Sequence, residues 1–397
     1  MNKILIIGAF DRFNYGDLLF PIIIEQQLKT YSSALDIEYF GIVESDLSSL
    51  GGKPTKSIQQ FYESCESGTQ RANIIVAGGE SIAVTWHSLL VALNKKYKII
   101  RRYQHHFEKF IDLNKFAKNI LKGQTELPFV FNSDDFKSVD HVIFNSLGGS
   151  EIPDSIFKKV KGLRKKLQQV DYFSVRDKVT KGNMDRLDIP TKLFPDSAIL
   201  MAKFYPNEVL ETLVSADVKS YVEKNVGNYV FFQINRNHAK NQEEQIANQL
   251  NAIYNQTQTE ICLCPIGKAS NHNDDEALQK ILPYLENTGH FFEEVNIWDI
   301  MYLIANSKCY IGTSLHGAIT AMSYAVPYVG VNVTKLNSYL NTWGIDGIDK
   351  IVKIDSLSEQ FNIAINISKE KLVQARDIQF QEIEKSFEYM KKLLMPD

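Results

Sequence analysis

Residues 3–24, KILIIGAFDRFNYGDLLFPIII, place two apolar runs on either side of a polar loop. The first run, 3–8, is typical of a buried strand, and the second is typical of a helix that follows turn-forming residues. A strand that leads through a short loop into a helix is the repeating unit of an open α/β sheet. The loop, with Asn14, Gly16 and Asp17, is either a tight connection or one wall of a ligand site.

The same alternation of apolar runs and helical stretches continues along the chain. It predicts strands at 3–8, 37–43, 73–79, 141–149, 172–176, 229–234, 260–265, 308–312 and 328–333. Continuous apolar strands separated by helices indicate parallel sheets that are covered on both faces. The pattern restarts near residue 228, so we expect an α/β protein with two doubly wound, Rossmann-like domains.

The length of 397 residues also favours two domains over one core. We expect an N-terminal domain over 1–205, with a basic helical insertion around 85–140, and a C-terminal domain over 206–397 with the donor site and the terminal helices. The last helix carries one apolar stripe, made by Ile383, Phe387, Met390 and Leu394. This helix packs either on its own domain or back across the first one.

The composition, with 44% hydrophobic and 23% charged residues, is that of a soluble globular protein. A net charge of −3 argues against a generally nucleic-acid-binding surface. The opening residues show neither a membrane span nor a signal peptide. The four cysteines lack zinc-type spacing, so we expect packing thiols, no metal site and a cytoplasmic location, with the inner face of the membrane as the alternative.

Residues 95–122 form a basic segment with nine Lys or Arg residues and only two acidic ones. Tyr103, Phe107 and Phe110 mark one helical face within it. The segment is either an amphipathic helix that covers the domain or a docking surface for an anionic acceptor or a membrane leaflet.

Ligands of open α/β sheets bind beyond the carboxyl ends of the strands. In the opening loop, Asp17 is a candidate helix N-cap, and Gly16 would let backbone N–H groups approach a ligand. The turn Gly78-Gly79-Glu80 after the third predicted strand also permits a close approach to phosphate or carboxylate. Such turns serve plain connections equally well, so both interpretations stay open.

Two later segments lie at strand ends as well. Arg176 could hold an anion bidentately or could pair with neighbouring acids. In residues 309–331, CYIGTSLHGAITAMSYAVPYVGV, a strand leads into a helix that begins with Ser314, Leu315, His316 and Gly317. The free N–H groups at the start of that helix favour an anion, and its dipole disfavours a protonated imidazole. We therefore expect His316 to exchange protons with a ligand.

Taken together and in this order, these segments resemble the polysaccharide pyruvyl transferase family. The matching stretches are Asn14-x-Gly16-Asp17, Gly78-Gly79, Ser174-Val175-Arg176-Asp177, FPDSAILM at 194–201, Leu315-His316-Gly317 and Ala325-Val326-Pro327. The resemblance implies two Rossmann-like domains arranged as in the GT-B glycosyltransferases. It also implies transfer of a pyruvyl unit from phosphoenolpyruvate to two hydroxyls of a sugar in a surface polysaccharide or its precursor, with no metal or redox cofactor. An anionic donor requires cations in the cleft, and the saccharide acceptor is expected to be lipid-linked or anionic if the basic segment guides it.

Two residues depart from the pattern of the family. Ser314 stands where the family commonly has arginine, and a serine can hydrogen-bond an anionic donor without neutralising it. Arg236, after the strand at 229–234, and Arg12 are the candidate substitutes. Glu80 stands where the family commonly has a small residue, and its carboxylate would repel an anionic donor but could act as a base toward a sugar hydroxyl.

Two alternatives remain beside pyruvyl transfer with His316 in acid–base catalysis. One is a GT-B-type glycosyltransferase that uses a nucleotide sugar, because a fold does not fix a function. The other is a non-catalytic, saccharide-binding member whose donor site has decayed at Ser314.

Overall fold

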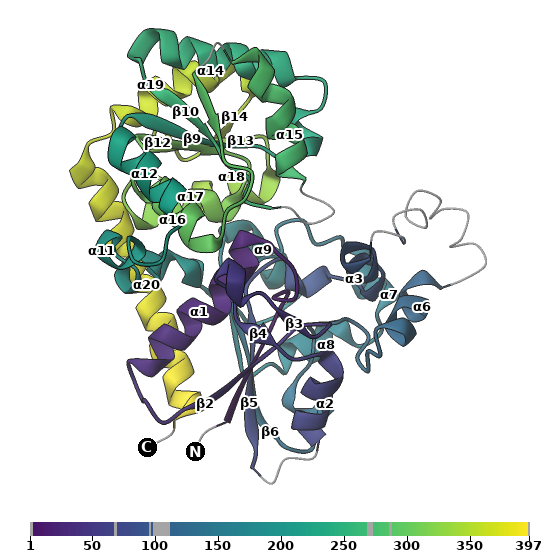
Figure 1. Ribbon diagram of the computed structural model, residues 1–397. Coiled ribbons are helices and arrows are strands. Elements are labelled where there is room, and N and C mark those ends of the chain that lie inside the picture. Colours follow the sequence, from purple (N-terminus) through teal and green to yellow (C-terminus); the bar gives the residue numbers. More distant parts are fainter. Residues whose placement is uncertain are drawn as a thin grey trace.

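The computed structural model describes residues 3–66, 70–94, 97, 112–267, 273–285 and 288–395. They form two α/β lobes, one above the other in Figure 1, each with a central sheet between helices. Most of the basic segment at 95–122 lies outside the described residues, so its role stays a prediction.

The first lobe is built on a six-stranded parallel sheet of order β2-β1-β5-β6-β7-β8. Its strands are β1 (Lys3–Ile7), β2 (Asp36–Phe40), β5 (Ala72–Ala77), β6 (Val139–Leu147), β7 (Tyr172–Val175) and β8 (Lys192–Leu193). The order reverses between β1 and β5, the switch point at which such sheets bind ligands. Ile7 of β1 lies opposite Val76 of β5, so the loops that follow these two strands begin side by side.

The second lobe contains another six-stranded parallel sheet, of order β11-β10-β9-β12-β13-β14. Its strands are β9 (Tyr229–Gln233), β10 (Glu260–Leu263), β11 (Gly289–Phe291), β12 (Cys309–Gly312), β13 (Tyr328–Val331) and β14 (Ile351–Val352). Here the switch point lies between β9 and β12, where Gln233 faces Gly312. All nine predicted strands are present. The prediction missed the edge strands β8, β11 and β14 because two or three residues are too few to show a period.

Helices cover both faces of each sheet, and a short antiparallel pair, β3 (Ser45–Asp46) with β4 (Pro54–Thr55), lies beside the first. The helices that precede β9 are α1 (Tyr15–Lys29), α2 (Ile58–Glu66), α3 (Trp86–Leu93), α6 (Leu113–Ile120), α7 (Ser155–Lys159), α8 (Leu163–Gln168), α9 (Lys178–Asp185), α10 (Met201–Phe204), α11 (Asn207–Leu210) and α12 (Ala216–Asn225). Those that follow it are α13 (Arg236–Ala239), α14 (Glu243–Thr257), α15 (Asp274–Ile281), α16 (Ile297–Ala305), α17 (Leu315–Ser323), α18 (Thr334–Trp343), α19 (Leu357–Ile365) and α20 (Lys369–Leu394).

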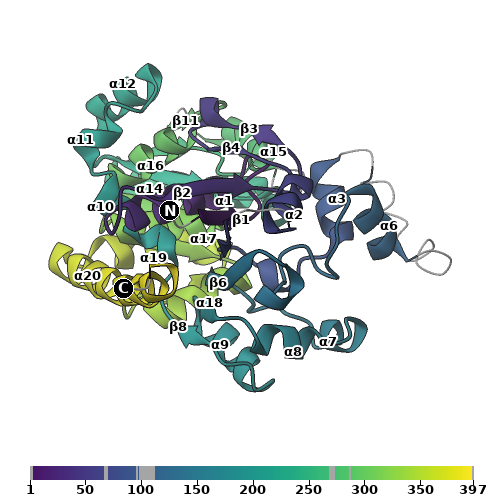
Figure 2. The same cartoon turned by 90° about the horizontal axis from the view of Figure 1, so that it is seen from below.

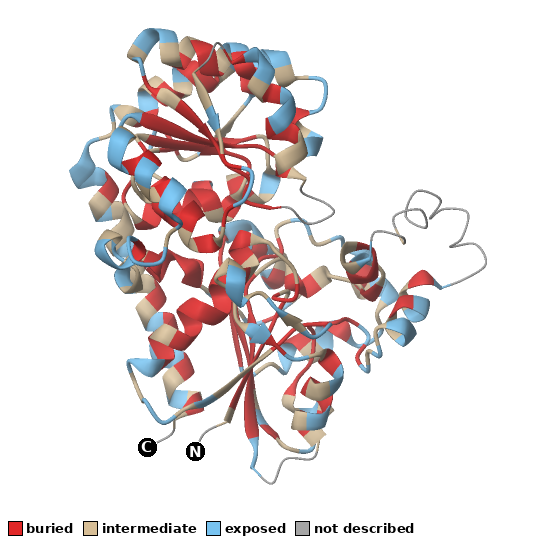
Figure 3. Cartoon of the chain, in the orientation of Figure 1, coloured by how far each residue is buried: buried red, intermediate tan, exposed pale blue. Residues whose placement is uncertain are grey.

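One hydrophobic core joins the two lobes. Strand β1 points Leu5 and Ile7 into a cluster confined to the first lobe, and points Ile4 and Ile6 into a cluster that continues through the second. Helix α1 lies between the first sheet and α16 and α17, which explains why it is buried around most of its circumference. Figure 3 shows this buried material running from one sheet to the other.

The long helix α20 crosses back to the first lobe, as one of the two alternatives predicted. Its stripe residues Ile383, Phe387, Met390 and Leu394 are all buried. Near its end, Ser386 Oγ lies 2.8 Å from the hydroxyl of Tyr172 in β7, and Asn145 in β6 donates to the sulfur of Met390 at 3.2 Å. Figures 1 and 2 show α20 running along one side of both lobes to the chain end. The predicted boundary at 205/206 stays a prediction.

All four cysteines are buried, as expected for packing thiols. Within the ranges given above, no helix is long and apolar enough to cross a bilayer.

Candidate active site

A cleft of about 400 Å³ lies between the two lobes at the carboxyl ends of both sheets. It brings together predicted site residues that are up to three hundred positions apart, namely Asn14, Asp17, Gly79, Glu80, Arg176, Ser314, Leu315 and His316. Further polar residues that the sequence did not single out also line it, among them Gln233, His238, Asp274 and Lys335.

The opening loop forms a wall of this cleft and contacts the other lobe. Asn14 forms an antiparallel bridge with Gly267, and the backbone N–H of Tyr15 donates to the carbonyl of Ile266 at 3.2 Å. The predicted N-cap at Asp17 is wrong, because α1 begins at Tyr15 and its N-cap is Asn14. Asp17 lies in the first turn, where its carboxylate accepts a hydrogen bond from the Asn14 side chain at 2.9 Å.

The start of α17 positions the predicted histidine. Ser314 is the N-cap, and its Oγ accepts a hydrogen bond from the N–H of Gly317 at 3.2 Å. Gln233 Oε1, at the end of β9, accepts from the backbone N–H groups of Thr313 at 3.1 Å and Ser314 at 3.0 Å. The protein itself therefore satisfies three of the N–H groups around the start of the helix.

His316 lies in the first turn of α17, between the two lobes. Its side chain is 13% exposed, and Nε2 is buried 3.6 Å from Oδ2 of Asp196. The ring of Phe20 contacts the imidazole edge-on, with 5.2 Å between ring centroids. A Cβ at position 16 would fall 1.9 Å from Nδ1, so the absence of a side chain at Gly16 makes room for the imidazole.

The paired glycines after β5 serve two different purposes. Gly78 has a positive φ of 55°, and a Cβ there would lie 2.0 Å from the ring of Phe20, which supports His316. Gly79, with a φ of 68°, lines the cleft itself. Gly78 therefore acts on the candidate site through packing, whereas Gly79 can approach a ligand.

Asp196 is the buried acid that links His316 to the first lobe. It is 0% exposed and accepts hydrogen bonds from Arg176 Nη1 and from the N–H of Ala198, each at 3.0 Å. Burial opposes its ionisation, but His316, Arg176 and the N–H of Ala198 outweigh burial and hold the pKa of Asp196 below its usual value. Asp196 is therefore a carboxylate whose negative charge faces the imidazole.

Arg176 lies between two carboxylates. Its Nη1 donates to Asp196, and its Nη2 donates to Glu80 Oε1 at 2.8 Å. Burial alone would lower the pKa of Arg176, but Glu80, Asp196 and Asp177 outweigh it and raise that pKa. The indole N–H of Trp343 in α18 also donates to the Arg176 carbonyl at 2.8 Å, which ties this segment to the second lobe. Arg176 thus pairs with acids in the structure, and its predicted contact with an anion stays a prediction.

Asp274 is a second buried acid of the cleft, at the first position of α15. Its Oδ2 accepts from Gln233 Nε2 at 2.8 Å and from the N–H groups of Ile266 at 3.0 Å and Gly267 at 2.9 Å. Burial nevertheless raises the pKa of Asp274 to about 7. Its Oδ1 has no hydrogen-bond partner within the described part of the chain. In the sequence Asp274 stands in the polar run NHNDDE, where nothing distinguishes it.

The two candidate substitutes for the arginine of the family lie in different places. Arg12 lines the cleft, with Nη1 2.9 Å from Asp11 Oδ1. Arg236 does not line it and pairs with Glu276 at 2.6 Å on the surface of the second lobe. Lys335 is an additional cation of the lining.

The lining as described contains as many carboxyl groups as permanent cations, which differs from the cationic cleft expected for an anionic donor. Its permanent cations are Arg12, Arg176 and Lys335. Its carboxyl groups are Asp17, Glu80 and Asp274. In the described ranges, no group of three or more His, Cys, Asp or Glu side chains could hold a metal ion.

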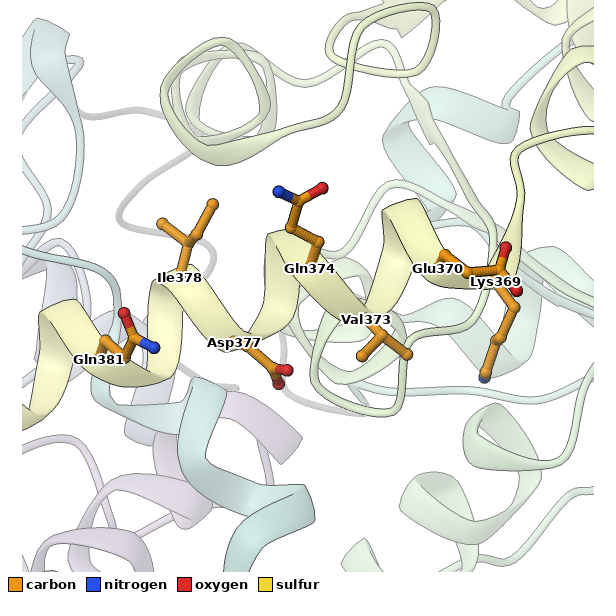
Figure 4. Close-up of a pocket in the computed structure, with 7 residues that line it drawn as sticks. All are labelled: Lys369, Glu370, Val373, Gln374, Asp377, Ile378 and Gln381. Atoms are coloured by element: carbon orange, nitrogen blue, oxygen red, sulfur yellow. The ribbon is translucent and has the colours of Figure 1, made fainter.

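A second hollow, of about 490 Å³, lies along α20 (Figure 4). Its seven lining residues all come from that one helix, and their side chains point in different directions rather than toward a common point. Groups that do not converge cannot fix the orientation of a small ligand. The cleft between the lobes is therefore the better candidate site.

Comparison with solved structures supports a GT-B-like fold. The S. aureus MnaA–UDP co-structure aligns with a TM-score of 0.60 at 12% identity, covering 99% of this chain and 97% of that one. The UDP-GlcNAc 2-epimerases of Methanocaldococcus jannaschii and Neisseria meningitidis, each bound to UDP-GlcNAc, both align with a TM-score of 0.56. The first is 12% identical, covering 93% of this chain and 94% of that one, and the second is 11% identical, covering 97% and 100%. At such low identity the likeness concerns the fold alone.

Comparison of the sequence with family models says more about this chain than the likeness in fold does. No curated protein matches this chain significantly. The family model for polysaccharide pyruvyl transferase matches residues 14–334, a span that begins at the opening loop and includes the start of α17. The chain belongs to the polysaccharide pyruvyl transferase family.

Proposed function

We propose that this protein transfers a pyruvyl group from phosphoenolpyruvate to a sugar of a surface polysaccharide or its precursor, with His316 in acid–base catalysis. Family membership supports the reaction type. One observation carries the role of His316, namely its place in the interlobe cleft with Nε2 3.6 Å from the ionised Asp196. We further propose that the reaction takes place in the cytoplasm, where phosphoenolpyruvate is made.

Asp196 determines which nitrogen of His316 acts as the base. A separation of 3.6 Å is long for a hydrogen bond, but the carboxylate still attracts a proton onto Nε2. The neutral ring then keeps its lone pair on Nδ1, beside Gly16. Nδ1 is thus the nitrogen that takes a proton from an acceptor hydroxyl.

The reaction needs a group that accepts a proton and later returns it, because protons move between the acceptor, the donor and phosphate. The acceptor loses one proton from each of two hydroxyls, the methylene carbon of the donor gains one to become a methyl group, and the other leaves with phosphate. His316 accepts a hydroxyl proton and can return it in a later step. We assign Ser314 and Arg12, which line the cleft, to the donor, and Asp17, which lines it as well, to the sugar hydroxyls.

Phosphate release from phosphoenolpyruvate, measured with and without candidate acceptor sugars, tests the proposal. Release should require an acceptor, and His316→Ala should abolish it. Gly16→Ala should cause a loss of at least a hundredfold, because the new Cβ would lie 1.9 Å from Nδ1 and displace the ring. His141→Ala is the matched control, since His141 is a partly exposed histidine near the amino end of β6, outside the cleft.

Turnover by His316→Ala at the parent rate would refute the catalytic assignment. A rise in melting temperature with UDP, and none with phosphoenolpyruvate, would replace the proposal with a nucleotide-sugar glycosyltransferase. Saccharide binding without any donor binding would indicate a non-catalytic protein. In that case Ser314→Arg should restore donor affinity if Ser314 alone caused the loss.

A further inference from the structure

Glu80 and Arg176 form an ion pair in the lining of the cleft. The two side chains are 2.8 Å apart, and both residues line the cavity. The Arg176 side chain is 2% exposed and Asp196 is 0% exposed, whereas the Glu80 side chain is 30% exposed. Glu80 is therefore the member of the Asp196–Arg176–Glu80 chain that can move toward solvent, while the other two are fixed by the surrounding protein.

The backbone places Glu80 there without using its carboxylate. Glu80 follows two glycines of positive φ and is the N-cap of the short helix η2 (Ser81–Ala83), but its side chain makes no capping hydrogen bond. Gly148 leaves the space for the pair, since a Cβ there would lie 2.3 Å from Glu80 Oε1 and 2.6 Å from Arg176 Nη2. In the described contacts, pairing with Arg176 is the interaction that holds the carboxylate of Glu80.

We propose that Glu80 is an internal anion that competes with an anionic donor for Arg176 and so sets the affinity and charge of the donor that the cleft accepts. This inference rests on the proposed function for the identity of the donor. Arg176 donates to Asp196 through Nη1 and to Glu80 through Nη2, so a carboxylate or phosphate of a ligand can take the Nη2 bond that Glu80 holds only by displacing Glu80. Since Arg176 cannot follow a ligand into the cleft, the displacement must come from Glu80.

The charge of the cleft strengthens the argument. With Glu80 in place the described lining carries as many carboxyl groups as permanent cations. Moving or neutralising the carboxylate of Glu80 makes the charge of the lining more positive by one unit, and moving it also frees the Nη2 bond for a ligand. A ligand with several negative charges gains most from this change, because Coulomb attraction grows with the charge of the ligand.

Isothermal titration calorimetry on the full chain tests the inference with phosphoenolpyruvate, inorganic phosphate and pyruvate as probes. Glu80→Gln removes the charge, while its amide oxygen can still accept the Arg176 hydrogen bond, so the chain should fold with little change in melting temperature. We expect Glu80→Gln to bind phosphoenolpyruvate and phosphate at least tenfold more tightly than the parent, with a smaller gain for pyruvate. Glu276→Gln is the matched control, because it removes a carboxylate from the Arg236 pair outside the cleft and should change these affinities less than twofold.

The outcomes separate this inference from the proposed function. Tighter phosphate binding by Glu80→Gln without any turnover of phosphoenolpyruvate would support the role of Glu80 as an internal anion. The same result would refute phosphoenolpyruvate as the donor. Equal affinities in the parent and Glu80→Gln, or no anion binding by either, would overturn the inference even if the protein transfers pyruvyl groups. An equal gain in Glu276→Gln would also overturn it, since the effect would then reflect total charge rather than the site.

Discussion

Asp196 and Asp274 are two buried acids of the candidate site whose pKa values are shifted in opposite directions. Asp196 lies between Arg176 and His316, and these partners hold its pKa below the usual value despite complete burial. Within the described residues, Asp274 receives hydrogen bonds from neutral groups, an amide and two backbone N–H groups, and burial raises its pKa to about 7.

The difference shows what a buried carboxyl group needs in order to stay charged. Three hydrogen bonds from neutral donors do not compensate Asp274 for the loss of water, whereas a guanidinium and an imidazole compensate Asp196. The Asp196 side of the cleft can therefore hold a fixed charge against His316. The Asp274 side offers a group that changes its charge near neutral pH.

Replacing Asp196 should have the largest effect on stability. Asp196→Ala leaves the buried Arg176 with Glu80 as its remaining carboxylate partner at the cleft, so we expect a loss of about 3–5 kcal/mol in the free energy of unfolding at pH 7. The loss should shrink below about pH 4, because the lowered pKa means that Asp196 stabilises the fold above its unfolded pKa and ceases to do so as pH falls.

Urea unfolding measures this effect, with Asp140→Ala as the control. Asp140 pairs with Arg71 on the surface, and such exposed pairs contribute less than about 1 kcal/mol. If Asp196→Ala lowered the free energy of unfolding no more than Asp140→Ala does, the ion pairs of Asp196, Arg176 and Glu80 would not stabilise the fold.

Asp274→Asn should raise the free energy of unfolding, by less than Asp196→Ala lowers it. The folded protein keeps the proton of Asp274 up to about pH 7, whereas the unfolded chain loses it near pH 4, so this group reduces stability as pH rises between these values. Asparagine does not titrate and can keep an acceptor oxygen toward Gln233. We expect Asp274→Asn to gain about 2–3 kcal/mol relative to the parent between pH 5 and pH 8.

Parallel urea titrations of parent and variant at these two pH values provide the measurement. A difference between parent and variant that does not change with pH would show that Asp274 is ionised throughout, like Asp196.

Ser314→Ala should have the smallest effect on the free energy of unfolding. Ser314 lies at the start of α17, next to His316, which faces Asp196, and its backbone N–H donates to Gln233, which bonds to Asp274. Loss of the N-cap bond to Gly317 should cost about 1 kcal/mol, and Ser314→Asn should restore most of it. Since neither serine nor alanine titrates, the cost measured by thermal unfolding should be equal at pH 5 and pH 8. A cost that changes with pH would show that the cap is coupled to Asp274 through Gln233.

Much of this architecture could be read from the sequence because its signals are local. Nine strands, the helix that begins after Ser314 and the apolar stripe of α20 follow from the spacing of neighbouring residues. The order of strands along the chain then placed the opening loop, the Gly78-Gly79 turn and His316 at ligand-binding edges. The short edge strands and the true N-cap of α1 were missed, because two or three residues carry no period and Asn14 and Asp17 both favour a cap.

No local pattern in the sequence indicates which side chains of the site are paired, buried or charged. The sequence left Gly16 open as a turn residue or a point of approach for a ligand, and it gave no sign that Gly16 makes room for an imidazole three hundred residues away. Arg236 follows a strand end just as Arg176 does, yet it pairs with Glu276 on the surface. Asp274 looked like any other acid of a polar loop.

The sequence by itself determined that the chain forms two parallel sheets and that a histidine lies at the carboxyl edge of the second, because hydrophobic period and capping act between near neighbours. The tertiary structure alone decided that Arg176 is shared by Asp196 and Glu80, and that the donors to the buried Asp274 in the described part of the chain are neutral. Charge and burial depend on which distant segments meet, and the energy of a buried charge is set by the groups within a few ångströms of it.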